Sequence, residues 1–194
     1  MATKKPKIPD WDQLFQFAVA QEGMFTTKQA AEAGFSPQLL SHYLRGRKII
    51  RLRRGIYRLV HYPAGDREDL VLLWLWTEQQ GIFSHQTALW LHHLSDLMPA
   101  GLDISLPPSW ARRRLRIPKG VVLHFQQVLN KDRQWFGPVP ATNPARTLRD
   151  CAANHLSPEF LQQATQEALR RGLVTQKEIP EVLRALEPFG GVGL

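Results

Sequence analysis

A segment of alternating apolar and basic residues, from Gly46 to Leu59, constrains the fold of this chain more than any other. Apolar side chains and arginines alternate on both sides of Arg54-Gly55, and alternation about such a turn is typical of a β-hairpin. One face of the hairpin is expected to cover neighbouring helices with Ile50, Leu52, Ile56, Tyr57 and Leu59. The arginines of the hairpin then point outward.

Three short helices are predicted ahead of the hairpin. The first runs from about Trp11 to Gln21 and follows Asp10, whose carboxylate is expected to cap it. The second follows Thr26, with Gln29 at the position that completes a capping box. The third has Ser36 as its expected N-cap and a proline at its first position, which favours a helix start.

The third helix has two chemically different faces. At 3.6 residues per turn, Leu40, Tyr43 and Leu44 share one face, and the opposite face holds only hydrogen-bonding side chains. These side chains are Gln38, Ser41, His42 and Arg45. The second and third predicted helices form a helix-turn-helix, and the basic hairpin that follows completes a winged helix-turn-helix domain. In such a domain these four residues of the third helix read base edges of double-stranded DNA.

The distribution of charge agrees with DNA binding. The formal net charge is +8, and residues 1–64 hold eleven lysines and arginines against four acids. Such an excess is expected where side chains contact DNA phosphates. The residues predicted to do so are Thr27, Lys28, Arg47, Lys48, Arg51, Arg53, Arg54 and Arg58. The alternative is that these cations form a solvated face on a small helical domain.

A second domain is predicted after the turn Pro63-Ala64-Gly65-Asp66. The expected division is residues 1–62 for the winged helix, 67–189 for the second domain and 190–194 for a flexible tail. Short strands are predicted over Asp103–Leu106 and Val121–Phe125, and helices return from about Pro144. The fold class is therefore α+β: an N-terminal winged helix-turn-helix followed by a mixed α/β domain with a small sheet and several helices.

The second domain shows no clear catalytic motif. Ser84, His85 and Asp150 are residue types of a hydrolytic triad, but a serine and a histidine that are adjacent at a helix start are expected to point apart. Ser84 is expected to cap its helix. We therefore predict no enzyme activity.

The sequence contains no motif typical of a cofactor site or of an exported protein. Cys151 is the only cysteine, and no Cys/His cluster has zinc spacing, so we predict a reducing cytoplasmic environment and neither metal nor cofactor. No segment has the length and apolarity of a signal peptide or membrane span.

A basic cluster in the second domain has two interpretations. It is a second nucleic-acid surface or a solvated hairpin tip. Its residues are Arg112, Arg113, Arg114 and Arg116.

Several segments resemble the AbiEi-type antitoxins of bacterial type IV toxin-antitoxin systems, which act in abortive infection and phage defence. The N-terminal part of the resemblance rests on residues 24–30 and 51–59. In the second domain, Ser84 to Leu89 and the stretch from Thr142 to Asp150 are similar to the family's C-terminal domain. The resemblance covers the chain from about Phe25 to Leu173.

The resemblance implies an antitoxin that also represses transcription of its own operon by binding repeats in its promoter. Its second domain would counteract a nucleotidyltransferase-like toxin, without a required stable complex. Because a small winged helix covers only one half-site, the chain is expected on DNA as a monomer or a dimer. Arg146 and Asp150 then either form an ordinary pair four residues apart on a helix or belong to the antitoxin surface. The alternatives are an orphan winged-helix regulator, or an enzyme or RNA-binding factor tethered to nucleic acid by its winged helix.

Overall fold

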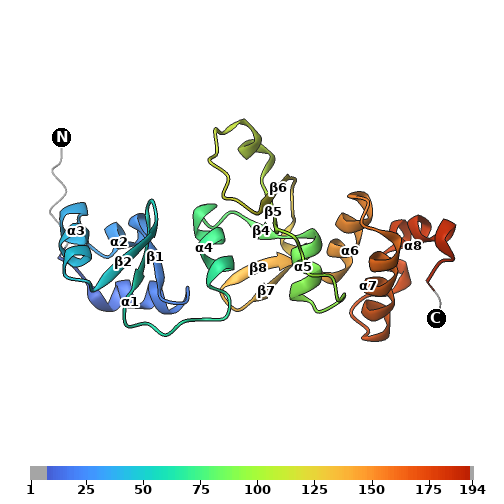
Figure 1. Ribbon diagram of the computed structural model, residues 1–194, viewed down its shortest axis with the longest axis horizontal. Coiled ribbons are helices and arrows are strands. Elements are labelled where there is room, and N and C mark those ends of the chain that lie inside the picture. Colours follow the sequence, from blue (N-terminus) through green and yellow to red (C-terminus); the bar gives the residue numbers. More distant parts are fainter. Residues whose placement is uncertain (1–7, 193–194) are drawn as a thin grey trace. The chain divides into compact units, whose positions relative to one another are not determined.

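The computed structural model describes residues 8–192, which divide into two compact units, one ending at Gln79 and the other beginning at Gln80 (Figure 1). The elements of the first unit are α1 (Trp11–Val19), β1 (Met24–Thr26), α2 (Thr27–Glu32), α3 (Pro37–Arg45), β2 (Ile49–Arg53), β3 (Ile56–Leu59) and α4 (Glu68–Trp76).

The predicted helix caps are all present in the first unit. The Asp10 carboxylate accepts a hydrogen bond from the Gln13 amide at 3.0 Å, at the start of α1. Thr26 and Gln29 form the predicted capping box at the start of α2. The Ser36 hydroxyl accepts from the Leu39 amide at 3.2 Å, at the start of α3. These local bonds satisfy amide groups that have no partner within the helix.

The predicted hairpin is β2 and β3, and it forms two strands of a three-stranded antiparallel sheet in the order β1-β3-β2. Strand β1 was not predicted, because three residues show too little periodicity to reveal a strand. One face of the sheet, with Phe25 and Ile49, packs into a core with residues of α1, α2 and α3. The prediction for Ile50 was wrong, because this side chain is 43% exposed and the neighbouring Ile49 is buried in its place.

Helix α4 contacts β1 and β3 and belongs to the first compact unit. Met24 and Ile56 are buried although they alternate with the residues that face α1 to α3. The sheet is therefore covered on both faces, by α1 to α3 on one and by α4 on the other. The sequence placed α4 after the domain boundary, whereas the compact unit extends to Gln79.

Within the described residues, the second unit contains a five-stranded mixed sheet and four α-helices. Its elements are β4 (Ile82–Phe83), α5 (His85–Leu91), β5 (Leu102–Leu106), β6 (Val121–Phe125), β7 (Arg133–Phe136), β8 (Val139–Thr142), α6 (Pro144–Ala153), α7 (Pro158–Arg170) and α8 (Pro180–Leu186). The strand order is β6-β5-β4-β8-β7, in which β5–β6 and β4–β8 are parallel and the other pairs antiparallel. The predicted α+β class is confirmed.

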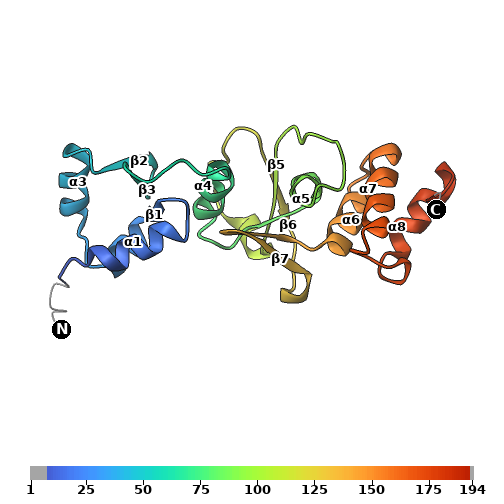
Figure 2. The ribbon, with the colours of Figure 1, turned by 90° about the horizontal axis from the view of Figure 1, so that it is seen from below.

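The last three helices pack side by side in both views of the second unit (Figure 2). Their core includes Leu148 and Cys151 from α6, Leu161 from α7 and Val182 from α8. Burial raises the pKa of the Cys151 thiol, so this cysteine is a core residue and not a reactive thiolate.

A flexible tail was predicted from residue 190, but residues 190–192 contact the preceding helices. The Gly191 amide donates to the Leu186 carbonyl at 3.0 Å, and the Gln162 side chain donates to the Gly191 carbonyl at 2.6 Å. Val192 also packs against the helical core. Residues 193–194 lie outside the described residues. Among those described, none belongs to a helix long and apolar enough to cross a membrane.

Candidate functional site

The outer face of α3 carries the four predicted base-reading residues, and all four are exposed. They are Gln38, Ser41, His42 and Arg45. The opposite face is anchored by Leu40, which is buried, and by Tyr43, whose ring packs edge-on against Trp11 with centroids 4.8 Å apart. The helix therefore presents hydrogen-bonding groups to solvent from a fixed apolar base.

The four side chains offer different hydrogen-bonding groups. Gln38 provides a donor and an acceptor, and Arg45 provides donors only. The Ser41 hydroxyl donates to the Pro37 carbonyl at 3.0 Å, so its oxygen remains as an acceptor. A mixture of this kind distinguishes base pairs in the major groove, where each pair shows its own donor and acceptor pattern.

The wing turn is tied to the start of α2. Gly55 occupies this turn with φ +79°, a conformation that favours glycine. Its carbonyl accepts hydrogen bonds from the Thr27 amide at 2.9 Å and the Thr27 hydroxyl at 3.3 Å. The helix-turn-helix and the wing are thus one bonded substructure rather than separate segments.

Two of the predicted phosphate contacts have internal partners instead. Both donors of Thr27 are used by Gly55, as described above. The Arg58 guanidinium lies 2.7 Å from the Glu68 carboxylate and donates to the Tyr62 carbonyl at 3.1 Å. It faces α4 because Arg58 pairs with Ile50 and Met24 across the sheet, on the face that α4 covers. The prediction that Arg58 points outward was wrong.

The other predicted phosphate contacts are exposed. They are Lys28, Arg47, Lys48, Arg51, Arg53 and Arg54. Within residues 8–192, none of these six forms an ion pair with a carboxylate. Lys48 lies 5.8 Å from the centre of the Tyr43 ring, and the Arg51 side chain reaches the Arg53 carbonyl at 3.4 Å. Cations without carboxylate partners produce a positive potential that attracts phosphate groups.

In the second unit, Arg146 and Asp150 form a pair that extends beyond the predicted intrahelical contact. The Arg146 Nε lies 2.7 Å from Asp150 Oδ1, with side-chain exposures of 17% and 8%. A second carboxylate, Asp132, lies 3.5 Å from the same guanidinium. The Gln126 amide donates to the other oxygen of Asp150 at 3.2 Å. Both residues are therefore held in a mostly buried polar network.

This network continues to Ser84 and His85. Gln126 also donates to the Ser105 hydroxyl at 2.9 Å, and Ser105 donates to the Ser84 hydroxyl at 2.8 Å. Ser84 Oγ lies 2.9 Å from His85 Nδ1, so the prediction that these neighbours point apart was wrong. The expected capping bond from Ser84 is also missing among the described hydrogen bonds, since its hydroxyl is engaged within this network.

The cause is the backbone at His85, which has φ +50° at the first position of α5. Histidine, like asparagine and aspartate, is one of the few residue types other than glycine that adopt this left-handed conformation with some frequency. The side chain consequently returns toward Ser84 instead of following the helix. Burial lowers the pKa of His85 to about 4, and the neighbouring His124 adds to this effect, so the imidazole is neutral at pH 7.

His85 also contacts two residues that were not predicted. Its ring stacks on that of His124, with centroids 3.6 Å apart and planes 16° from parallel. His124 Nε2 lies 2.8 Å from Asp103 Oδ1. One sequence signal was available: Asp103 and Ser105 are polar residues that alternate with apolar ones in a buried strand. Such positions need polar partners.

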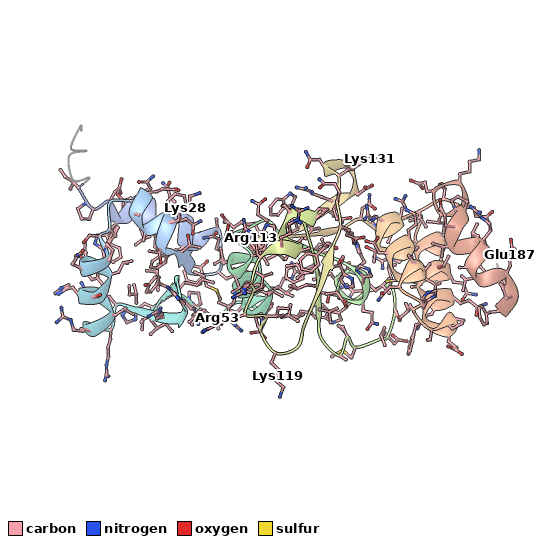
Figure 3. All side chains as sticks on the ribbon, turned by 90° about the horizontal axis from the view of Figure 1, so that it is seen from above. Lys28, Arg53, Arg113, Lys119, Lys131 and Glu187 are labelled. Atoms are coloured by element: carbon pink, nitrogen blue, oxygen red, sulfur yellow. The ribbon has the colours of Figure 1, made fainter. Side chains whose placement is uncertain are left out.

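The predicted basic cluster lies in the long connection between β5 and β6, which projects from the sheet in Figure 1. Arg112, Arg113, Arg114 and Arg116 are all exposed, and the Arg113 guanidinium stacks 3.9 Å from the centre of the buried Trp110 ring. Figure 3 shows Lys119 extending from the end of this connection into free space. The connection thus carries several exposed cations on a segment anchored by Trp110.

Parts of this chain are similar to known proteins. The chain is similar to the RV2827C protein from Mycobacterium tuberculosis, with 19% identity, a TM-score of 0.42, and 90% of this chain and 80% of that chain covered. A comparison with curated proteins gives no match. Residues 12–60 match the model of a family described as "Transcriptional regulator, AbiEi antitoxin". The predicted resemblance to AbiEi-type antitoxins is therefore confirmed over the segment that runs from α1 to the end of β3.

Proposed function

We propose that this chain is an antitoxin that represses its own operon by binding double-stranded DNA through its winged helix. The observation that carries the proposal is the exposed polar face of α3, flanked by cations that form no ion pair with a carboxylate of residues 8–192. Both features lie in the segment that matches a transcriptional-regulator family. In this arrangement α3 enters the major groove and the wing contacts phosphates.

Each side chain has a specific role in this proposal. Arg45 donates two hydrogen bonds to a guanine, and Gln38 pairs with an adenine, because these geometries match the base edges. Ser41 and His42 contact adjacent base edges. The phosphate contacts are Lys28, Arg47, Lys48, Arg51, Arg53 and Arg54. Repeats in the promoter would be bound by a monomer at each repeat or by a dimer.

We further propose that the second unit counteracts a nucleotidyltransferase-like toxin encoded beside this gene, without a required stable complex. The support is that Arg146 and Asp150, from a segment that resembles AbiEi-type antitoxins, join one network with Ser84 and His85. Arg112, Arg113, Arg114 and Arg116 form a second candidate surface for nucleic acid or for the antitoxin function.

A gel-shift titration tests the DNA-binding proposal. Full-length protein is titrated against its own upstream promoter and against a scrambled duplex of equal length, at ~150 mM salt. Tighter binding to the promoter is expected. Equal binding to both duplexes, with the same salt dependence, would contradict a sequence-specific repressor.

Co-expression tests the antitoxin proposal separately. The adjacent gene is induced with wild-type chain or with Arg146→Ala, at matched protein levels measured by immunoblot. Rescue of growth by wild type and loss of rescue by Arg146→Ala are expected. Full rescue by Arg146→Ala would remove this residue from the antitoxin surface, and no rescue by wild type would reject the antitoxin function.

A further inference from the structure

Two histidines and an aspartate meet where β5, β6 and the start of α5 come together. Nitrogen and oxygen atoms of His85, Asp103 and His124 all lie within 4.8 Å of one another. Imidazole nitrogens and carboxylate oxygens are ligands of zinc and of related divalent transition metals. We propose that these three residues form a binding site for one such ion, with zinc as the natural probe.

The pair of His124 and Asp103 provides two of the ligands. Their Nε2 and Oδ1 atoms are 2.8 Å apart, a hydrogen bond that places a proton between nitrogen and oxygen. Donor atoms of a tetrahedral zinc site lie about 3.4 Å apart, given Zn–N and Zn–O bonds of ~2.0–2.1 Å. An ion therefore replaces this shared proton with only a small separation of the two side chains, and the proton is released to solvent.

The third ligand is His85, whose orientation is fixed by groups behind it. Nδ1 of this ring is bonded to Ser84 Oγ, which leaves Nε2 for the ion. Ser84 is itself held by Ser105 at 2.8 Å. Metal-binding histidines commonly bond their second ring nitrogen to a neighbouring polar group, which sets the tautomer and the ring orientation. When the ion is bound, His85 Nδ1 carries the ring proton and donates a hydrogen bond to Ser84 Oγ.

The position of the cluster also suits an ion. His85 and Asp103 are 5% and 7% exposed, and the His124 side chain is 15% exposed and lies on the edge strand β6. Carboxylates this deeply buried are generally paired or bound to metals. Three protein ligands leave a fourth tetrahedral position for water or another small molecule.

Binding requires one change in the cluster. The rings of His85 and His124 are stacked nearly parallel, whereas an ion lies in the plane of every imidazole that binds it. One ring must therefore turn about its Cβ–Cγ bond when the ion enters. The stacking of the His85 and His124 rings is therefore lost when the ion binds.

The site is independent of the proposed DNA binding and was not visible in the sequence, because its three residues come from separate elements. The test uses full-length protein without a histidine tag, treated with chelator and titrated with Zn²⁺ by calorimetry. Saturable binding of one ion per chain is expected. With Co²⁺, tetrahedral coordination is expected to give a strong visible absorption.

Three variants assign the ligands. His85→Asn preserves a residue type that tolerates the left-handed backbone, and His124→Gln preserves a polar side chain on the strand. Each is expected to weaken Zn²⁺ binding by about tenfold or more, as is Asp103→Asn. The matched control is His155→Asn: this histidine also has a left-handed φ, +55°, but is exposed and lies outside the cluster. Its binding is expected to equal that of wild type.

A measurement on unmodified protein avoids dependence on variants that fail to fold. Nuclear magnetic resonance of the imidazole nitrogens is expected to show that His85 and His124 shift on adding Zn²⁺ while the exposed histidines do not. The proposal is overturned if wild type shows no saturable binding, or if the shifts occur only at exposed histidines. Equal binding by folded His124→Gln and wild type would also overturn it.

Discussion

The basic side chains on α3 and the wing of the first unit are exposed, while the arginines on α6 and α7 of the second unit are paired with acids. Arg45 and Arg53 form no ion pair within the described residues, whereas Arg146 contacts two aspartates. Arg58 shows that the distinction is not simply one of position in the chain. It belongs to the wing but pairs with Glu68, on the face of the sheet that α4 covers.

The difference shows that a count of arginines does not measure a DNA-binding surface. An arginine opposite a carboxylate has its charge compensated and contributes little to the potential felt by a phosphate. What matters is whether the strand register turns the side chain toward solvent or toward an acidic neighbour.

Arg146→Leu is expected to have the largest effect on stability. Removing one member of a mostly buried ion pair leaves Asp150 uncompensated, which costs about 3–5 kcal/mol in the free energy of unfolding. Urea unfolding of the full chain, followed by circular dichroism, measures this loss. Arg170→Ala is the control, because Arg170 also pairs with an acid, Glu167, but its side chain is 73% exposed. Equal stability of both variants would show that the buried Arg146–Asp150 pair contributes no more to stability than an exposed pair.

Arg45→Ala is expected to reduce the preference for the promoter over a scrambled duplex. A bidentate contact to a base contributes about 1–3 kcal/mol of discrimination. Competition gel shifts with the two duplexes measure the preference. If affinity for both duplexes falls by the same factor, Arg45 contacts phosphate rather than a base.

Arg53→Ala is expected to weaken binding to both duplexes alike. Log affinity falls as log salt concentration rises, and loss of one phosphate contact makes this slope less negative by ~0.9. Titrations between about 50 and 200 mM salt measure the slope. Arg58→Ala is the matched control within the wing, and its slope should equal that of wild type because Glu68 already compensates Arg58. A shallower salt dependence for Arg58→Ala than for wild type would contradict its assignment.

His92→Gln is expected to make the second unit less sensitive to acid. Burial lowers the pKa of His92 below its ordinary value of 6.5, despite the bond of its Nε2 to the Thr142 carbonyl. As the pH falls through 6.5, the unfolded chain therefore takes up a proton that the folded chain does not, and stability falls.

Thermal melting at pH 7 and pH 5 measures the effect of this substitution. The difference in Tm between the two pH values should be smaller for His92→Gln than for wild type. Part of the difference should remain, because the pKa of His85 is also lowered and shifts stability in the same direction. An unchanged difference would show that His92 takes no part in the acid response.

The sequence predicted the features that depend on neighbouring residues. The caps at Asp10, Thr26 and Ser36 and the turn at Gly55 involve groups a few residues apart, so local chemistry determines them. The polar face of α3 follows from helical periodicity alone. The exposure of its four residues therefore agreed with the prediction.

Features that depend on distant parts of the chain could not be predicted in the same way. The short strands β1, β4, β7 and β8 exist because of their pairing partners and have little pattern of their own. The contact of Ser84 with His85 depends on the left-handed φ of His85, which could not be predicted from the residue types in this segment. The joining of Gln126, Ser105 and Asp150 requires a sheet register that only the fold supplies.

The cover that α4 provides over the sheet has a consequence for transplanting the DNA-binding part of this chain. A fragment that stops at residue 62 retains every predicted DNA contact but would expose Met24 and Ile56 to water and leave Arg58 without Glu68. Such a fragment is expected to aggregate. An isolated DNA-binding domain that is fused to a reporter or to another effector domain should therefore end after Gln79, where the compact unit ends.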